Sequence, residues 1–274
     1  MNSIGVVGLG KMGGAIARSL TAHGYPVSTW DRTTAPGPIE ALVSAVDTVI
    51  VMLWGDEVAR EVTLGRVIPA AHAKQLVIEM STLSPAMYET LESAATAREI
   101  EFLAAPVLGS VGAVADGSIT ILPSGPQATY ERARPLLESL GKTVIYTGSP
   151  RASGVLKLAN NTIIGIVGET LAELLAFCDR GGVERTLAVE SLTGAFGRIA
   201  GSKRQQLLDR DSEPRFALDA LLKDLRLARE AAASLQVAMP TLDCVLPDFE
   251  RASQSGLGSR DYIAIALEPQ GVRQ

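Results

Sequence analysis

The chain has 274 residues, of which 47% are hydrophobic and 20% charged, enough for one large or two modest globular domains. A net charge of −5 without a long basic run argues against a nucleic-acid-binding protein. Two distant cysteines exclude a disulfide framework, and two isolated histidines argue against a metal site. The chain opens without a signal sequence and has no uncharged apolar stretch of about 18 residues, so we expect a cytoplasmic protein outside the membrane. Cys178 and Cys244 are expected to be reduced core thiols.

The first 33 residues predict a strand, a glycine-rich turn, a helix and a second strand in immediate succession. Residues 4–7 are apolar and lead into Gly-x-Gly-x-x-Gly, and the strand at 26–30 ends on an acidic residue. This order is typical of a dinucleotide-binding site, and it disfavours the alternative of a purely structural turn. The expected cofactor-binding residues here are Gly8, Leu9, Gly10, Lys11, Met12, Gly13, Asp31, Arg32 and Thr33.

Each glycine of the turn has a separate expected role. Gly8 allows the tight turn, Gly10 lets a pyrophosphate approach the backbone, and Gly13 lets the helix pack on the strand. The free N–H groups at the start of the helix favour a bound phosphate.

Apolar strands alternate with helices through the first half of the chain. Further strands are predicted at 48–53, 75–80, 101–105, 118–122 and 143–146, with a helix starting at Ser84-Pro85. Continuous apolar strands separated by helices indicate a parallel sheet covered on both faces. We therefore predict an α/β fold, with a doubly wound Rossmann domain at 1–150 that binds NAD(P).

Beyond residue 150 the apolar residues recur with helical periodicity. A long helix is predicted at 155–180, ending at Gly181-Gly182, and further helices at 186–197, 199–209, 215–236 and 240–254. Residues 151–274 are therefore predicted to form an all-helical domain for substrate binding and dimerisation, joined to the first by the long interdomain helix. That helix is too apolar to be solvated on every side, which favours a homodimer with the active site between domains.

Polar and glycine-rich segments follow several predicted strands, at the edge where open α/β sheets bind ligands. Met52-Leu53 and Ser81-Thr82 are expected to contact the nicotinamide and its ribose. Leu108, Gly109 and Ser110 form a loop that is expected to bind substrate. The simpler interpretation of the same residues is an ordinary glycine-rich loop that binds no ligand.

Lys157 and Asn161 lie four residues apart in the long helix and therefore share one face. A buried ammonium has a lowered pKa and is suited to protonate a carbonyl oxygen as a general acid. A lysine that extends its ammonium to solvent, with asparagines that cap a neighbouring element, explains the spacing equally well. Lys223, beside Asp224, is either part of a solvated helix face or a second cation for an anionic substrate.

Taken together and in this order, these motifs resemble the β-hydroxyacid dehydrogenase family, within the 6-phosphogluconate dehydrogenase superfamily. This family includes 3-hydroxyisobutyrate dehydrogenases and the glyoxylate, succinic semialdehyde and tartronate semialdehyde reductases. The resemblance covers nearly the whole chain. The segments that carry it are the turn Gly8 to Gly13, the loop Ala105 to Ser110, Lys157 with Asn160 and Asn161, and Lys223-Asp224.

The resemblance implies reversible hydride transfer between a nicotinamide cofactor and a small carboxylate-bearing carbonyl compound or 3-hydroxy acid. Lys157 would be the acid/base and Asn161 would orient the substrate. The remaining substrate-binding residues would be Ser110, Gly109, Leu108, Asn160 and Lys223, and Lys223 would also approach the cofactor. The alternatives are an imine reductase-like enzyme and a non-catalytic NADP-binding protein. Imine reductases of this architecture typically lack the lysine.

Two departures from the family pattern stand out. Leu108 occupies a position where many relatives have a serine, and residues 34–46 are too few for the helix and additional strand that relatives place there. Asp31-Arg32-Thr33 combines an acidic residue typical of NAD enzymes with the Arg-Thr pair that holds the phosphate of NADP. We favour NADP(H) over NAD(H), because both phosphate-binding residues are present.

Overall fold

The computed structural model describes residues 3–180, 182–234 and 240–267. The chain forms two compact units, Met1–Lys157 and Leu158–Gln274.

The first unit contains a five-stranded parallel sheet in the order β2-β1-β3-β4-β5. Its strands are β1 (Ile4–Val7), β2 (Val27–Trp30), β3 (Thr48–Val51), β4 (Leu76–Glu79) and β5 (Glu101–Ala104). Register pairs the last residue of each strand with the last residue of its neighbour, from Trp30 through Val7 to Ala104. The loops that follow β1 to β4 therefore leave the sheet at one common edge.

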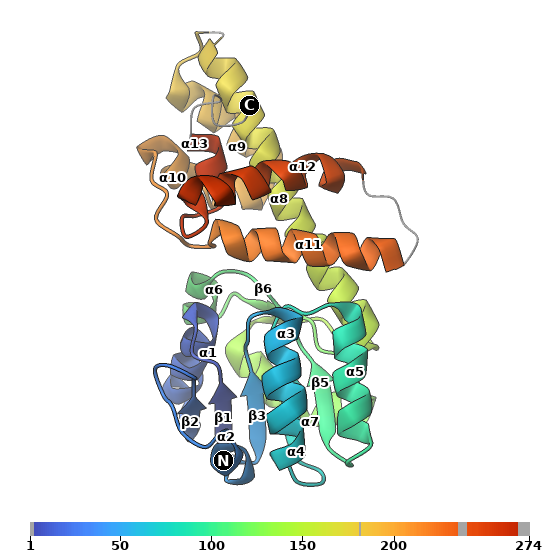
Figure 1. Ribbon diagram of the computed structural model, residues 1–274. Coiled ribbons are helices and arrows are strands. Elements are labelled where there is room, and N and C mark those ends of the chain that lie inside the picture. The colour runs from blue at the N-terminus through green and yellow to red at the C-terminus, as the bar shows by residue number, and fades with distance from the viewer. Residues whose placement is uncertain (1–2, 181, 235–239, 268–274) are drawn as a thin grey trace. The chain divides into compact units, whose positions relative to one another are not determined.

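Helices cover both faces of this sheet, as the sequence predicts (Figure 1). One face packs against α1 (Lys11–Ala22), α6 (Val111–Ala115) and α7 (Gln127–Leu140). The other packs against α2 (Ile39–Ser44), α3 (Gly55–Ala59), the π-helix η1 (Arg60–Val67), α4 (Ile68–Ala70) and α5 (Pro85–Thr96). Buried apolar residues on both faces stabilise the doubly wound arrangement that we predicted.

The predicted strands at 118–122 and 143–146 do not extend the parallel sheet. They shorten to β7 (Thr120–Ile121) and β8 (Thr143–Val144), which form a separate sheet with β6 (Val107–Leu108). In that sheet β6 pairs antiparallel with β7. Pro106 follows β5 and has no N–H to continue the ladder, and one isolated bridge from Ala104 to Ser124 connects the two sheets.

The segment after β2 is as short as the sequence implies. Asp31 forms a single bridge with Ala35, and α2 then begins at Ile39. β2 is the edge strand of the five-stranded sheet, and Ser28 and Thr29 are exposed on it. The chain thus adds no strand on this side of the sheet before it returns to β3.

The second unit is helical. Its elements are α8 (Pro150–Arg180), which begins in the first unit, α9 (Arg185–Gly201), α10 (Arg204–Asp209), α11 (Leu218–Ser234), α12 (Pro240–Ala252), the π-helix η2 (Ser253–Leu257) and α13 (Ala264–Leu267). The helix predicted from 215 begins at Leu218 instead, because the N–H groups of Arg215 and Phe216 bond the carboxylate of Asp261 (2.9 and 3.0 Å). Its predicted end at 236 and the predicted stop at Gly181 lie outside the described residues.

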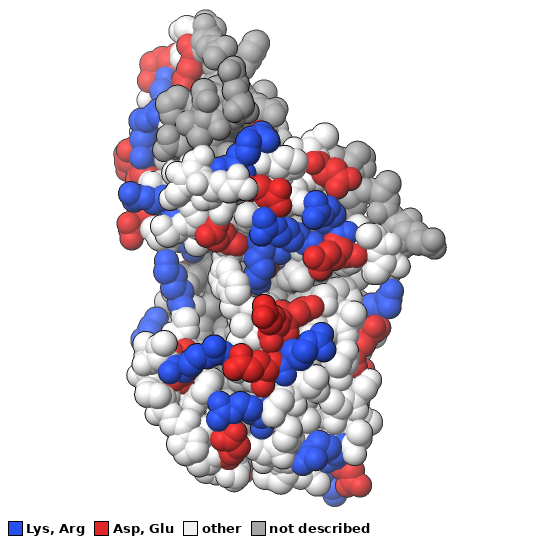
Figure 2. All heavy atoms as spheres, viewed as in Figure 1, with Lys and Arg blue, Asp and Glu red and all other residues white. Residues whose placement is uncertain are grey.

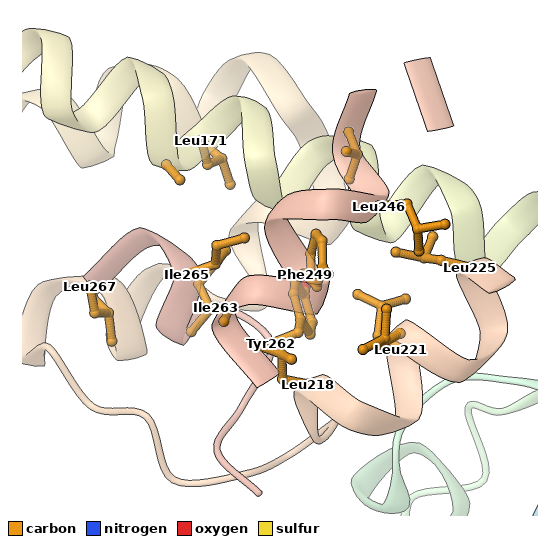
Figure 3. Packing of buried hydrophobic residues seen from close by; sticks show 14 of the residues in the cluster. Leu171, Leu218, Leu221, Leu225, Leu246, Phe249, Tyr262, Ile263, Ile265 and Leu267 are labelled. Carbon is orange, nitrogen blue, oxygen red and sulfur yellow. The ribbon is translucent and has the colours of Figure 1, made fainter. Parts of the chain in front are cut away.

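A continuous apolar core holds these helices together (Figure 3). Phe249 and Tyr262 lie at its centre, among leucines of α8, α11 and α12. Cys178 lies half-buried beside this core, but Cys244 is exposed, so the expectation of two core thiols is wrong for Cys244. The periodicity of α12 places residue 244 on the solvent side of that helix.

Candidate functional site

The glycine turn between β1 and α1 has the geometry that its spacing predicts. Gly8 has a φ of +93°, and a Cβ there would lie 2.2 Å from the Met52 carbonyl oxygen. A Cβ on Gly13 would lie 2.0 Å from the Gly8 carbonyl oxygen. A Cβ on Gly10 would meet no atom within 4 Å apart from those of its chain neighbours. Gly8 and Gly13 are therefore required by the fold itself, whereas Gly10 borders open space.

That open space lies at the N-terminus of α1. No side chain caps this terminus, and Lys11, the first residue of the helix, is exposed. The first N–H groups of a helix have no acceptor within the helix and carry a partial positive charge. Gly10 and the first turn of α1 therefore form a cradle that fits a diphosphate, which is what a dinucleotide would place there.

The carboxylate of Asp31 joins the glycine turn to the loop after β2. Its Oδ2 accepts the N–H of Leu9 (3.0 Å). Its Oδ1 accepts the N–H and hydroxyl groups of Thr33 and Thr34, at 2.8–3.0 Å. These donors hold the pKa of Asp31 well below its usual range. Asp31 therefore fixes the glycine turn against the loop after β2 as a permanently charged group.

Arg32 and Thr33, the other residues expected at the adenine side of a cofactor, are exposed. The Arg32 guanidinium forms an ion pair with Glu61 on η1 (3.0 Å), and both side chains are about 60% exposed. An exposed ion pair of this kind is weak, so Arg32 is able to exchange Glu61 for another anion.

The loops after β3 and β4 are joined at the same edge of the sheet. The Leu53 N–H donates to the Ser81 hydroxyl oxygen (2.7 Å), and the Tyr88 hydroxyl donates to the Ser81 carbonyl. Met52, Leu53 and Thr82 are half-buried, whereas Ser81 is fully buried. The structure thus brings together two predicted cofactor-binding pairs, with the Ser81 hydroxyl turned into the protein.

Glu79 is the functional candidate in this region that the sequence reasoning missed. It is fully buried at the end of β4 and accepts hydrogen bonds from the Ser81 hydroxyl, the Ser81 N–H (3.1 Å) and the Thr63 hydroxyl (2.8 Å). Burial raises the pKa of Glu79 to about 7 in spite of these three donors, and the charge of Asp56 adds to the increase. A lone carboxylate in the apolar strand 76–79 was the available signal.

The loop after β5 carries the predicted substrate-binding residues. Gly109 has a φ of +135°, and Ser110 is the N-cap of α6, where its hydroxyl oxygen accepts the Ala113 N–H (3.4 Å). Gly109 and Ser110 are exposed, and Leu108 is half-buried. The Ser110 hydroxyl is therefore accessible, but it also serves the short helix that follows it.

One face of α8 carries a buried polar row. Ser153, Lys157 and Asn161 follow one another at intervals of four residues and are all buried, with Lys157 8% exposed. Asn160 is half-buried on an adjacent face, and Leu156 is exposed. Burial of the Lys157 side chain disfavours the interpretation of a lysine that extends to solvent.

Asp224 on α11 is a second residue that the sequence reasoning did not include in the site. It is buried, and its carboxylate accepts a hydrogen bond from the side-chain amide of Asn161. Lys223 forms an ion pair with the same carboxylate (2.9 Å). Asp224 therefore determines which end of the Asn161 amide is the donor, and it links Lys223 to Asn161. The Lys-Asp pair in a leucine-rich helix was the signal.

Further observations concern the part of the chain that the structure describes. No group of three or more His, Cys, Asp or Glu residues in this part of the chain is arranged to hold a metal ion. None of its helices is long and apolar enough to cross a membrane. On the face shown in Figure 2, basic and acidic side chains are interspersed, without a patch of one sign.

Comparison with known proteins gives matches to both parts of the chain. Residues 3–148 match the family model of the NAD-binding domain of 6-phosphogluconate dehydrogenase, and residues 152–267 match that of the NAD-binding domain of NADP-dependent 3-hydroxyisobutyrate dehydrogenase.

Individual relatives match over nearly their full length. The oxidoreductase YfjR of Bacillus subtilis is 30% identical, with 96% of this chain and 98% of the relative covered. L-threonate dehydrogenase of Escherichia coli K12 is 27% identical, with 96% and 93% covered. The crystal structure of 3-hydroxyisobutyrate dehydrogenase from Salmonella typhimurium is 26% identical and superimposes with a TM-score of 0.86, covering 96% of this chain and 98% of that one.

Proposed function

Because this chain belongs to the β-hydroxyacid dehydrogenase family and is a nicotinamide-dependent oxidoreductase of hydroxyl and carbonyl groups, we propose that Lys157 is its general acid/base. The proposed substrate is a small carboxylate-bearing carbonyl compound or the corresponding 3-hydroxy acid. Two of the relatives named above, L-threonate dehydrogenase and 3-hydroxyisobutyrate dehydrogenase, carry the names of hydroxy acids. The observation that carries the assignment is the buried polar row of α8, with the amide of Asn161 oriented by Asp224.

The residues of the first unit fit a dinucleotide. The open space beside Gly10 and the uncapped start of α1 would hold the pyrophosphate, and the loops with Met52, Leu53 and Thr82 would approach the nicotinamide end. When bound, the nicotinamide supplies or accepts the hydride. The division into a cofactor-binding domain at 1–150 and a substrate domain at 151–274 is part of this proposal.

The protein side chains then handle the proton and the orientation of the substrate. In reduction, the Lys157 ammonium donates its proton to the substrate oxygen, and in oxidation the neutral amine takes it back. Asn161 orients the reacting group, because Asp224 holds its amide in one orientation. Ser110 with the Gly109 backbone, and Lys223 with Asn160, are proposed to bind the substrate carboxylate.

The cofactor is proposed to be NADP(H). Asp31 Oδ1 already accepts hydrogen bonds from Thr33 and Thr34, so this oxygen is less available to a ribose hydroxyl than it is in a typical NAD site. Arg32 is exposed at the same place, where it forms an exposed ion pair with Glu61. A 2′-phosphate would attract Arg32 more strongly than the single carboxylate does.

Arg32→Ala is expected to weaken NADPH binding at least about tenfold, because it removes the charge-assisted bonds to the 2′-phosphate. NADH binding should stay unchanged. Fluorescence titration of the wild type and the variant with each cofactor measures both affinities. Glu61→Gln is the matched variant and should strengthen NADPH binding by at most a few-fold. Tighter binding of NADH than of NADPH by the wild type would overturn the NADP(H) proposal.

We also propose that the chain forms a homodimer in the cytoplasm. Leu156 and Ile163 are 42% and 48% exposed, and they lie seven residues apart along one side of α8. The exposed thiol of Cys244 suits a reducing compartment. Light scattering should give twice the chain mass of 28.8 kDa, and the monomer mass would contradict the proposal. Subcellular fractionation tests the location.

A further inference from the structure

Glu79 is a buried titratable group that the proposed chemistry does not use. It lies at the carboxyl end of β4, two residues before Ser81 and three before Thr82. A buried carboxylate is costly unless it accepts hydrogen bonds, and Glu79 accepts three, one from Thr63 on η1 and two from Ser81 in the loop after β4. Because an apolar residue would fill this buried position at less cost, the carboxylate is expected to have a specific role.

The contacts define a chain of hydrogen bonds that runs from Glu79 to the loop after β3. The Ser81 hydroxyl donates its proton to Glu79, and its oxygen accepts the Leu53 N–H (2.7 Å). An ionised carboxylate forms hydrogen bonds about twice as strong as a neutral acid does. The charge of Glu79 therefore strengthens the bond that holds the Ser81 hydroxyl in the position that Leu53 requires.

We infer that Glu79 is a positioning residue, whose ionisation holds the loops with Leu53 and Ser81-Thr82 in the form that binds the nicotinamide half of the cofactor. This inference rests on the proposed cofactor site. Protonation of Glu79 weakens the bond to Ser81, so cofactor affinity falls as the pH is lowered through the pKa of Glu79.

The surroundings of Glu79 are consistent with one dominant titration. Asp56 on α3 is the charged group that acts on it, and the carboxylate of Asp56 accepts the Ser84 N–H (2.8 Å). Thr63 from η1 is a neutral donor to Glu79. The residues in register with Glu79 on the neighbouring strands, Val51 on β3 and Ala104 on β5, are apolar. Tyr88 from α5 bonds the Ser81 carbonyl. Burial of Glu79 among these groups is therefore the main cause of its raised pKa.

The cofactor-free chain offers an independent measurement of this titration. The pKa of Glu79 in the folded chain, about 7, lies above its ordinary value of 4.5, so the folded state holds the extra proton between these pH values. Stability should therefore fall as the pH rises from about 4.5 through 7. Glu79→Gln should remove this contribution, which thermal unfolding at pH 5 and pH 8 would show as a change of a few degrees.

The deciding experiment is the dissociation constant of NADPH, and of NADH in parallel, between about pH 5.5 and 8.5. The wild type should bind about fivefold more weakly at the acid end, and Glu79→Gln should lose this difference. The 2′-phosphate of NADPH also titrates near pH 6, but it does so equally with both proteins. Glu92→Gln on α5 is the matched control, since burial also raises the pKa of Glu92, and it should keep the wild-type profile.

Thr63→Val provides a second variant that leaves Leu53 and Ser81 untouched. It removes a donor that stabilises ionised Glu79, so the midpoint of the affinity profile should move to higher pH. A purely structural role for Glu79 would not move that midpoint. Three results would overturn this inference but leave the proposed function intact. They are a wild-type affinity that does not depend on pH, a Glu79→Gln profile that matches the wild type, and a midpoint that does not move in Thr63→Val. If neither cofactor binds at any pH, both this inference and the proposed function are overturned.

Discussion

Replacement of Lys157 is expected to lower turnover at least about 100-fold, while cofactor affinity stays within a few-fold of the wild type. The factor corresponds to the lower range for loss of a general acid or base. Lys157 is buried on α8, where a side chain that serves only solubility would be exposed. Turnover with an aldehyde acid such as glyoxylate or succinic semialdehyde, and titration with NADPH, measure the two quantities separately.

Lys157→Met is the more informative variant, because methionine keeps much of the buried stem and removes the ammonium. Lys157→Ala adds the loss of packing to the loss of charge. Arg151→Ala is the matched control on α8, since Arg151 is exposed and forms a long ion pair with Glu89 (3.5 Å). It should keep wild-type turnover.

Near-normal aldehyde reduction by both Lys157 variants would remove Lys157 from the mechanism. Reduction of cyclic imines that survives Lys157→Ala would instead support imine chemistry. Cofactor binding without turnover of any carbonyl compound by the wild type would support a non-catalytic NADP-binding protein. The three results differ in which substrate, if any, is consumed.

The strand, glycine turn and helix at the start of the chain were predictable because the residues that form them follow one another directly in the sequence. Gly8 and Gly13 are enforced by backbone atoms only a few ångströms away, and the apolar run of β1 is continuous. The parallel sheet and the helical second half follow from periodicity in the same way. The second small sheet was not predictable, because it depends on where Pro106 ends the first one.

The partners of the polar site residues depend on contacts distant in sequence. Asn161 and Asp224 are 63 residues apart, and only the packing of α8 and α11 reveals that one orients the other. Asp31 was correctly identified as the acidic residue at the end of β2, but its role depends on the conformation of Thr33 and Thr34. Glu79 stands out in the sequence as a lone carboxylate in an apolar strand, but only the structure shows that it is buried.

Gly10→Ala is expected to lower cofactor affinity at least about 100-fold without a loss of stability in the cofactor-free chain. The backbone of Gly10, with φ of −56° and ψ of −179°, is accessible to alanine, and its Cβ would meet no atom within 4 Å apart from those of its chain neighbours. The methyl group would instead occupy the space proposed for the pyrophosphate. Loss of two charge-assisted hydrogen bonds accounts for a factor of this size. Thermal unfolding and NADPH titration measure the two effects.

The neighbouring glycines separate a cofactor effect from a folding effect. Gly13→Ala should destabilise the cofactor-free chain by roughly 1–3 kcal/mol, because its Cβ would lie 2.0 Å from the Gly8 carbonyl oxygen. Gly14→Ala should stabilise α1 slightly and leave cofactor affinity unchanged, because its Cβ would meet only the flexible end of Arg18 at 3.4 Å and the Leu9 oxygen at 3.5 Å. Only the Gly10 variant should combine wild-type stability with lost binding. Wild-type NADPH affinity in that variant would place the pyrophosphate elsewhere, and the proposed cofactor site would then be wrong.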